Sequence, residues 1–138
     1  MKDQLLRSLL FIILLAGLAA CSGRDNPTPT VRFSAPANNA TASSPVHVVM
    51  TAENFTIEPA GEVRAEAGHL HIMIDTPCLP AGDVIPNDET HRHFGDGSTE
   101  ADLELSPGRH TLCLQAADGA HIALEGAGMT HQISLTVE

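Results

Sequence analysis

Tryptophan and tyrosine are absent from this chain, and four phenylalanines are its only aromatic hydrocarbon side chains. The lack of tryptophan removes a core residue typical of antibody domains. Basic residues are scarce as well, with 7 lysines and arginines against 17 aspartates and glutamates. Because a formal net charge of −10 repels phosphate groups, we expect no nucleic-acid partner.

The motifs of common enzyme classes are also missing. The sequence has no nucleophile elbow, no phosphate-binding glycine loop and no cysteine–histidine arrangement with a third orienting group. We therefore expect a protein that is not an enzyme.

One apolar run stands near the start of the chain. Residues 9–20 are all apolar or small, and the basic residues Lys2 and Arg7 precede them. This order is typical of a secretory signal peptide. A run of 12 residues is too short to span a bilayer as a helix, which takes about 20.

The apolar run ends on Leu18-Ala19-Ala20-Cys21, which resembles the lipobox of bacterial lipoproteins. In that motif the cysteine thiol accepts a diacylglycerol. Ser22 follows the cysteine, in place of the aspartate associated with retention at the inner membrane. The expected location is the cell envelope, with the lipid at Cys21 anchoring the chain to the periplasmic face of the outer membrane.

These features predict three parts, namely a lipoprotein signal peptide (1–20), the lipidated cysteine with a flexible tether (21–30), and one domain (31–138). The tether is polar and contains proline. Without Lys2, Arg7 and Asp3, the exported chain keeps 5 basic and 16 acidic residues, a formal charge of −11. About 118 residues are enough for one domain with one core.

Two cysteines remain once Cys21 is assigned to lipid. Cys78 and Cys113 form an even pair in an oxidising compartment, so a disulfide is expected. Closing such a loop stabilises a fold by about 3 to 4 kcal/mol in the chain-entropy description. The alternatives are two buried free thiols, or one thiolate that serves as a soft metal ligand.

Apolar residues alternate with period two in short segments that proline, glycine, asparagine and aspartate separate, which predicts an antiparallel all-β domain. The expected strands cover residues 31–35, 46–51, 55–57, 68–75, 90–94, 101–105, 109–116 and 132–138. We expect a loop at 36–45, a long connection at 76–89, and a hairpin in which 90–94 and 101–105 flank a turn. About seven short strands favour an immunoglobulin-like antiparallel β-sandwich, with a jelly roll or a small barrel as alternatives.

Histidine is the unusual residue of the domain. All eight lie between His47 and His131, and four of them form two H-x-H pairs, His69/His71 and His91/His93. In a strand, residues two apart point to the same face, about 6.5 to 7 Å from each other, so each pair can place two imidazoles on one ion. We predict a copper or zinc site with these four ligands. The alternative is that the two pairs are ordinary surface residues that never meet.

The remaining histidines divide into three kinds. His121 lies in a loop and can approach either pair, so it is a further candidate ligand, and Met73 is a soft thioether on the His69/His71 face. His110 and His131 are in phase with inward residues, so we expect hydrogen-bonded structural roles. His47 is expected at the surface.

Two resemblances follow from these motifs. The segment 91–97 is weakly similar to the histidine-rich strand of Cu/Zn superoxide dismutases. A broader match covers about residues 60–138, where Gly68-His69-x-His71, Thr90-His91-x-His93-Phe94-Gly95, Pro107-Gly108-x-His110 and Asp118-x-x-His121 resemble the domain of unknown function 4399 family. That resemblance implies an exported β domain with recurring histidines and no assigned activity.

Three hypotheses remain open. The first is a non-catalytic, lipid-anchored protein that binds copper or zinc. The second is a module that contacts envelope proteins or polysaccharide and uses its histidines for packing. The third is a redox enzyme of the superoxide dismutase kind.

Overall fold

The computed structural model of the protein describes residues 27–138. The predicted signal peptide, Cys21 and most of the predicted tether lie outside these residues. The described chain forms these elements: β1 Thr30–Ala35, β2 Ala40–Ala42, β3 Val46–Glu53, β4 Thr56–Ile57, β5 Ala67–Ile74, β6 His91–Phe94, β7 Glu100–Leu103, β8 Gly108–Ala117, the 3-10 turn η1 Ala127–Met129, and β9 Thr130–Val137. None of the helical segments in 27–138 has the length and apolar character needed to cross a membrane.

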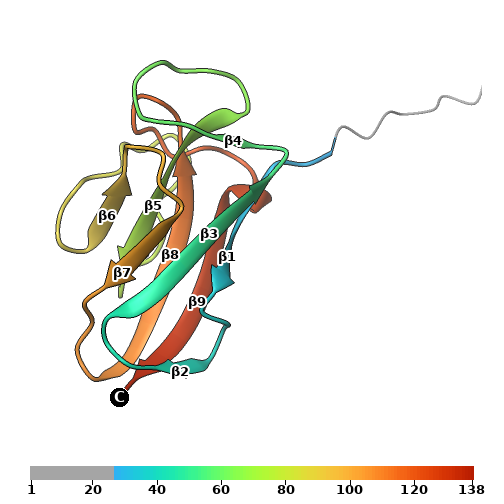
Figure 1. The fold of residues 1–138 in the computed structure, drawn as a ribbon. Helices are drawn as coiled ribbons and strands as arrows, with labels where there is room; N and C mark the ends of the chain where they lie inside the picture. The colour runs from blue at the N-terminus through green and yellow to red at the C-terminus, as the bar shows by residue number, and fades with distance from the viewer. Residues whose placement is uncertain (1–26) are drawn as a thin grey trace, which may run out of the picture.

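The strands form two sheets that pack face to face (Figure 1). The smaller sheet has the order β1-β3-β7. The larger sheet has the order β2-β9-β8-β5-β4, and β6 pairs with β5 on the edge that β4 also uses. The predicted all-β sandwich is therefore confirmed, and the immunoglobulin-like strand arrangement stays a prediction. Seven strands have four or more residues, while β2 and β4 are shorter.

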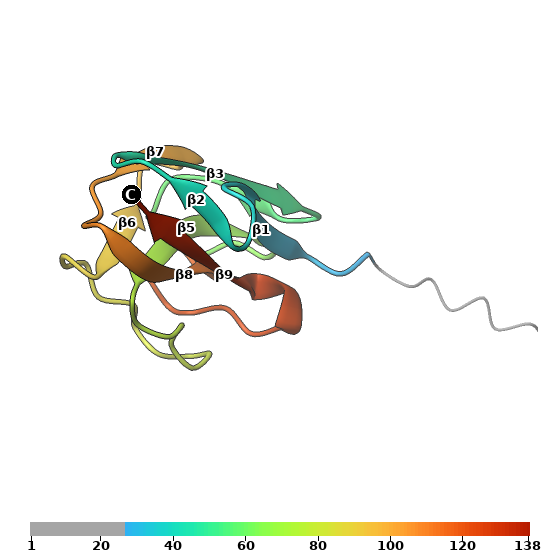
Figure 2. The same ribbon diagram turned by 90° about the horizontal axis from the view of Figure 1, so that it is seen from below.

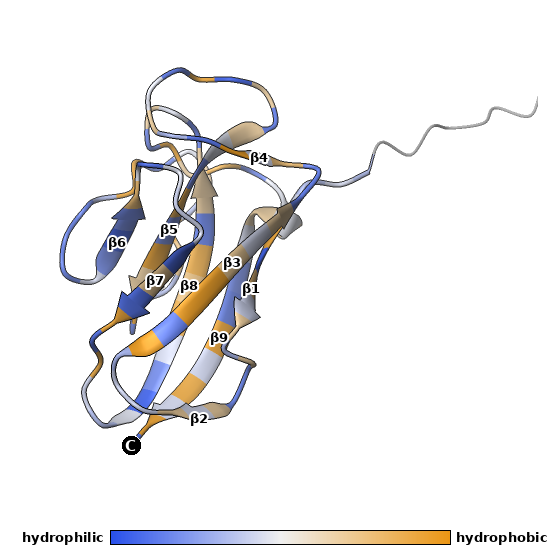
Figure 3. Cartoon of the chain, in the orientation of Figure 1, coloured by the Kyte–Doolittle hydropathy of each residue, from blue (hydrophilic) through white to orange (hydrophobic). Residues whose placement is uncertain are grey.

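The main core lies between the two sheets. Alternate residues of each long strand point into it, as the period-two pattern predicts. Val48 and Met50 come from β3, and Leu112 and Leu114 come from β8; all four are essentially inaccessible to solvent. Figure 3 shows the result as orange stretches along β3, β8 and β9, whereas the edge strand β6 is blue.

The central strand β5 is buried on both faces, with only Ile74 at its end partly accessible. Leu70 and Ile72 enter the main core. The other face is covered by loops, which lie beyond the larger sheet in Figure 2. A second, smaller apolar cluster forms beneath those loops from Met73, Ile85, Cys113, Ala117 and Ala123. The histidine face of β5 is consequently an interior surface.

The predicted hairpin of 90–94 with 101–105 is wrong. β6 pairs with β5 in the larger sheet, and β7 pairs with β3 in the smaller one, so the turn between them carries the chain across the sandwich. Phe94 and Leu103 reach the same core from opposite sheets. A strand–turn–strand pattern does not distinguish a hairpin within one sheet from a crossover between two sheets, because both arrangements bury alternate residues in one core.

The segment 36–45 is not entirely a loop. Its residues Ala40–Ala42 form β2, which pairs in parallel with the end of β9. This strand escapes sequence analysis because it has three small or polar residues, none of them fully buried, between asparagine and serine neighbours.

Candidate metal centre

Two strands bring three histidines together. His69 and His71 lie two residues apart on β5, so their side chains share one face. His93 of the neighbouring strand β6 pairs directly with His71 in the antiparallel ladder. Sheet register alone therefore places three imidazoles next to one another, and their ligand atoms lie within 4.8 Å of one another.

The rings of these three histidines are in contact. The Nε2 atoms of His69 and His71 are 3.0 Å apart. The ring centroid of His93 lies 4.9 Å from that of His69 and 5.0 Å from that of His71. In a tetrahedral zinc site with Zn–N bonds of about 2.0 to 2.1 Å, ligand nitrogens lie about 3.3 Å apart. The spacing of the inner pair is close to that value.

A fourth imidazole comes from the turn that follows β8. The Nε2 atom of His121 lies 3.1 Å from Nε2 of His93, and its ring centroid is 4.8 Å from that of His69. Asp118 shapes this turn, because its Oδ1 accepts the N–H groups of Ala120 and Ile122. His121 itself has a φ of 68°, a left-handed conformation uncommon for residues other than glycine.

Burial keeps the inner imidazoles neutral. His69 and His71 are fully inaccessible to solvent. Burial, with the nearby His121 and His93, lowers the pKa of His69 to about 4. Burial and the neighbouring imidazoles lower the pKa of His71 to about 3, and burial also lowers the pKa of His93. At neutral pH each of these rings is therefore uncharged. Its unprotonated nitrogen has a lone pair that a metal ion can bind without first displacing a proton.

The inner pair also lacks partners for two of its polar atoms. The Nδ1 atoms of His69 and His71 are buried and have no hydrogen-bond partner among residues 27–138. Because the nitrogens that converge are the Nε2 atoms, an ion held there would leave both Nδ1 atoms without a partner. Neutral imidazole is a good ligand for zinc, copper and nickel. The donor set of this cluster fits such an ion, because all four groups are imidazoles and their ring centroids lie 4.7 to 5.9 Å apart.

The connection between β5 and β6 covers the centre. The disulfide between Cys78 and Cys113 ties this connection to β8, with their Cα atoms 5.6 Å apart. The amide of Gln115 holds it a second time, since its Oε1 accepts the Leu79 N–H at 2.9 Å and its Nε2 donates to the Leu79 carbonyl at 2.8 Å. Farther along, Ile85 N–H donates to the carbonyl of His121 at 2.9 Å. The predicted disulfide is thus present and belongs to the cover of the histidine cluster.

The other predicted site residues lie apart from this cluster. Among residues 27–138 the contacts between two histidine rings join His69, His71, His93 and His121, and His91 lies outside that set. The Nδ1 atom of His91 is 2.9 Å from Oδ1 of Asp88, a contact that lowers the pKa of Asp88 to about 2. Met73 is fully buried in the second apolar cluster.

Three histidines have the roles that their phase predicts. His110 is buried, with Nδ1 2.7 Å from Oδ2 of Asp75 and Nε2 2.8 Å from the carbonyl of Ser106. The ring of His131 is partly buried, and its Nδ1 accepts the N–H of Phe33 at 3.0 Å. His47 is exposed beside Asp102.

Sequence reasoning missed two residues that position the cluster. Asp118 shapes the turn of His121. The sequence signal that could have identified it is an aspartate before a glycine, because such a side chain can accept backbone N–H groups a few residues ahead. Gly95 lies against the imidazole of His93, where an added Cβ would overlap the ring. The segment before β5 is hydrogen-bonded to the backbone at Gly95 and in the turn of His121. The N–H of Ala60 donates to the carbonyl of Gly95, and the N–H of Gly61 donates to the carbonyl of Gly119.

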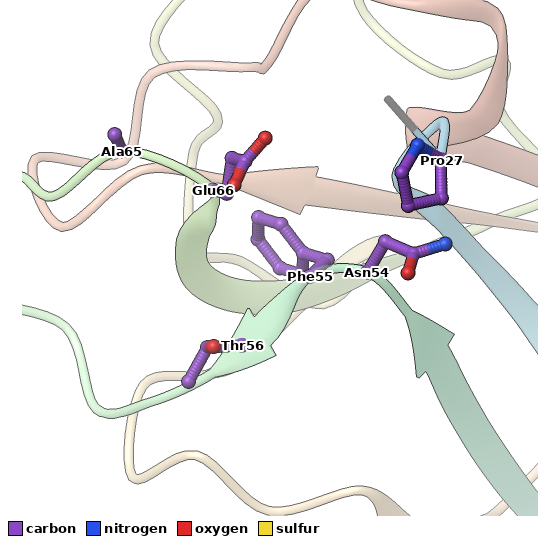
Figure 4. A pocket seen from close by; sticks show the side chains of 6 residues that line it. All are labelled: Pro27, Asn54, Phe55, Thr56, Ala65 and Glu66. Atoms are coloured by element: carbon purple, nitrogen blue, oxygen red, sulfur yellow. The ribbon is translucent and has the colours of Figure 1, made fainter. Parts of the chain in front are cut away.

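Two hollows lie on the surface of the domain. One, of about 450 Å³, borders His93 and is lined by residues of β6, β7 and the turn between them, including Asp96 and Glu100. The other, of about 560 Å³, lies away from the histidines at Pro27, Asn54, Phe55, Thr56, Ala65 and Glu66 (Figure 4). Figure 4 shows the Phe55 ring between Glu66 and Asn54, with no histidine among the labelled residues. Of these two hollows, only the first is lined by a histidine of the cluster.

Residues 48–138 match the family model of the domain of unknown function 4399 (DUF4399), which is about two thirds of the chain. The chain belongs to the DUF4399 family. The match includes every histidine of the cluster. No curated protein matches this DUF4399 chain.

One solved structure aligns with the DUF4399 chain, the X-ray structure of the endo-beta-1,4-mannanase from Thermotoga petrophila. The two are 16% identical with a TM-score of 0.49, and the alignment covers 85% of this chain and 21% of the mannanase chain. The chain therefore spans about a fifth of that protein's length. A likeness at this level says nothing about activity.

Proposed function

We propose that this DUF4399 protein is a non-catalytic, lipid-anchored protein of the bacterial envelope that binds one copper or zinc ion. The observation that carries the proposal is the convergence of His69, His71 and His93, whose ligand atoms lie within 4.8 Å of one another and two of which are fully buried. His121 can supply a fourth imidazole. Catalytic zinc sites keep one position open, whereas four protein ligands complete a tetrahedron.

The disulfide supports the location. Such bonds form and persist in oxidising compartments such as the periplasm. Cys78 and Cys113 are bridged, as expected for a chain exported by the signal peptide predicted at residues 1–20. The lipid on Cys21 would then attach the domain to the periplasmic face of the outer membrane.

Metal content of the purified protein tests the proposal. We expect about one zinc or copper ion per chain in the wild type, and a loss of that ion in the His69→Ala/His71→Ala variant. His47→Ala is the matched control, because it removes an exposed histidine on the other sheet. His93→Ala is a second test variant in which a partly exposed ring is removed, so a folding defect is less of a concern.

Thermal unfolding gives an independent measurement. A ligand that binds only the folded state adds about 2.7 kcal/mol at a concentration 100 times its Kd. Zinc or copper should therefore raise the Tm of the wild type and of His47→Ala, and chelator should reverse the rise. Equal, substoichiometric metal in the wild type and in the double variant, with no change in Tm, would show that the histidines serve packing alone.

A further inference from the structure

The four imidazoles of the cluster are not held equally. His69 and His71 are fully buried on the central strand β5, while His93 and His121 are partly exposed. His93 is nevertheless part of β6, whose backbone pairs with β5 over all four residues. His121 is the member of the cluster that does not lie on a strand.

The backbone of the turn that carries His121 is held by hydrogen bonds to Asp118 within the turn and by bonds from Gly61 to Gly119, from Ile85 to His121 and from Ala123 to Asp83. The partly exposed imidazole of His121, in contrast, contacts the other histidine rings of the cluster. The backbone of His121 is left-handed, a conformation that costs a residue with a Cβ some free energy. Rotation of the side chain about its χ angles would withdraw the ring without breaking any of these backbone hydrogen bonds.

The main core does not include the histidine cluster. Eighteen buried residues between the sheets form it, and none of them is a histidine. The cluster lies on the opposite face of β5, and the disulfide independently ties its covering connection to β8. The fold therefore has its own sources of stability, so an ion can leave without unfolding the domain.

From these observations we infer that His121 is an exchangeable ligand, past which a divalent metal ion enters and leaves a fixed centre of His69, His71 and His93. The ion is then a cargo that the protein takes up and releases, as distinct from a permanent structural ion. This inference rests on the proposed function and adds the route and the mobile ligand to it.

The test measures how fast an excess of a chromogenic chelator extracts zinc from the loaded protein. The main variant is His121→Gly, because glycine adopts the left-handed backbone without cost and the imidazole alone is removed. We expect His121→Gly to keep one zinc ion but to lose it at least about 10-fold faster, since even the loss of an outer-shell partner costs about 10- to 100-fold. Free imidazole should slow the extraction again by filling the vacated position.

Two comparison variants separate the possible outcomes. His47→Gly should exchange zinc at the wild-type rate, and His69→Ala should fail to hold zinc stoichiometrically. An unchanged rate in His121→Gly would overturn the inference and leave His121 as a hydrogen-bond partner of His93. Loss of zinc in His121→Gly to the same degree as in His69→Ala would also overturn it, because His121 would then be a core ligand. A wild type that binds no zinc or copper would instead refute the proposed function itself.

Discussion

At the scale of single residues, the position of His93 depends on a neighbour with no side chain. Gly95 follows two residues after His93, and the imidazole occupies the space that a Cβ at Gly95 would need. The carbonyl of Gly95 also accepts the N–H of Ala60, which fixes the backbone there. The ring is the part that has to move if this space is filled, because a side chain shifts more easily than a hydrogen-bonded backbone.

Gly95→Ala should therefore weaken metal binding without unfolding the protein. We expect the metal affinity to fall by about 10- to 100-fold, the range seen when the support of a ligand is lost, while the Tm of the metal-free protein changes little. Titration calorimetry with zinc checks the affinity. In a His93→Ala background the same substitution should have no further effect on binding, and an additive loss there would contradict the proposed contact.

Residue-level reasoning named all four histidines of the cluster and one further histidine, His91, that lies outside it. The pairs His69/His71 and His91/His93 stand out because strand geometry puts alternate residues on one face. Nothing in that pattern shows that Asp88, three residues before His91, takes the Nδ1 of that histidine. His121 lies 50 residues from His71 along the chain, so only the folded structure shows their proximity.

At the scale of elements, the connection between β5 and β6 is a built part of the domain. It carries no strand of its own, yet it is fixed at Cys78 by the disulfide and at Leu79 by Gln115. It also pairs with the segment after β8 through the bridge Val84–Ile122. A long proline-rich segment that sequence analysis expects to be tied down is tied down at several points.

Removal of the disulfide should cost a predictable amount of stability. The bond closes a loop with a sequence separation of 35, for which chain entropy gives about 3 to 4 kcal/mol. We expect Cys78→Ser/Cys113→Ser to lower the free energy of unfolding by that amount in urea titrations. A dithiol reductant should lower the stability of the wild type similarly and leave the variant unaffected; a variant as stable as the wild type would contradict this.

Element prediction worked where strands are long and failed where topology decides. The strands β3, β5, β8 and β9 follow from their alternating residues almost to their ends. The sequence does not predict the pairing partners of β6 and β7. An alternating pattern of apolar residues indicates which residues are buried, but not which strand lies alongside. β2 is too short for any pattern to show.

At the scale of the whole molecule, two groups of histidines respond to pH in opposite directions. His69 and His71 have folded-state pKa values lowered to about 4 and 3. Between those values and about 6.5 the unfolded chain binds more protons than the folded one, so acid destabilises the fold. His110 has a raised pKa through its hydrogen bond to the Ser106 carbonyl and its contact with Asp75, so its contribution is present below about 6.5 and is lost as the pH rises through its folded-state pKa.

The metal-free protein should therefore lose stability as the pH falls from about 6.5 towards 4, because two buried imidazoles resist protonation and one paired imidazole offsets them only in part. The stabilisation that the ionised Asp88 provides is lost only at lower pH, because the contact with His91 lowers the pKa of Asp88 to about 2. Unfolding in urea across this range checks the expectation. The decline should be shallower in His69→Gln/His71→Gln, and an equally steep decline there would assign the acid sensitivity to other groups.

The double burial of β5 has a consequence for how the sheet assembles. Its leucine and isoleucine face the main core while its histidines face the covering loops. A slip of one residue against β8 would send two imidazoles into a hydrocarbon interior and put Leu70 and Ile72 beside His93 and His121. Both exchanges are unfavourable, because polar imidazoles would lie in an apolar core and apolar side chains would lie among histidines. The side chains proposed to hold an ion therefore also favour the correct alignment of β5 with β8.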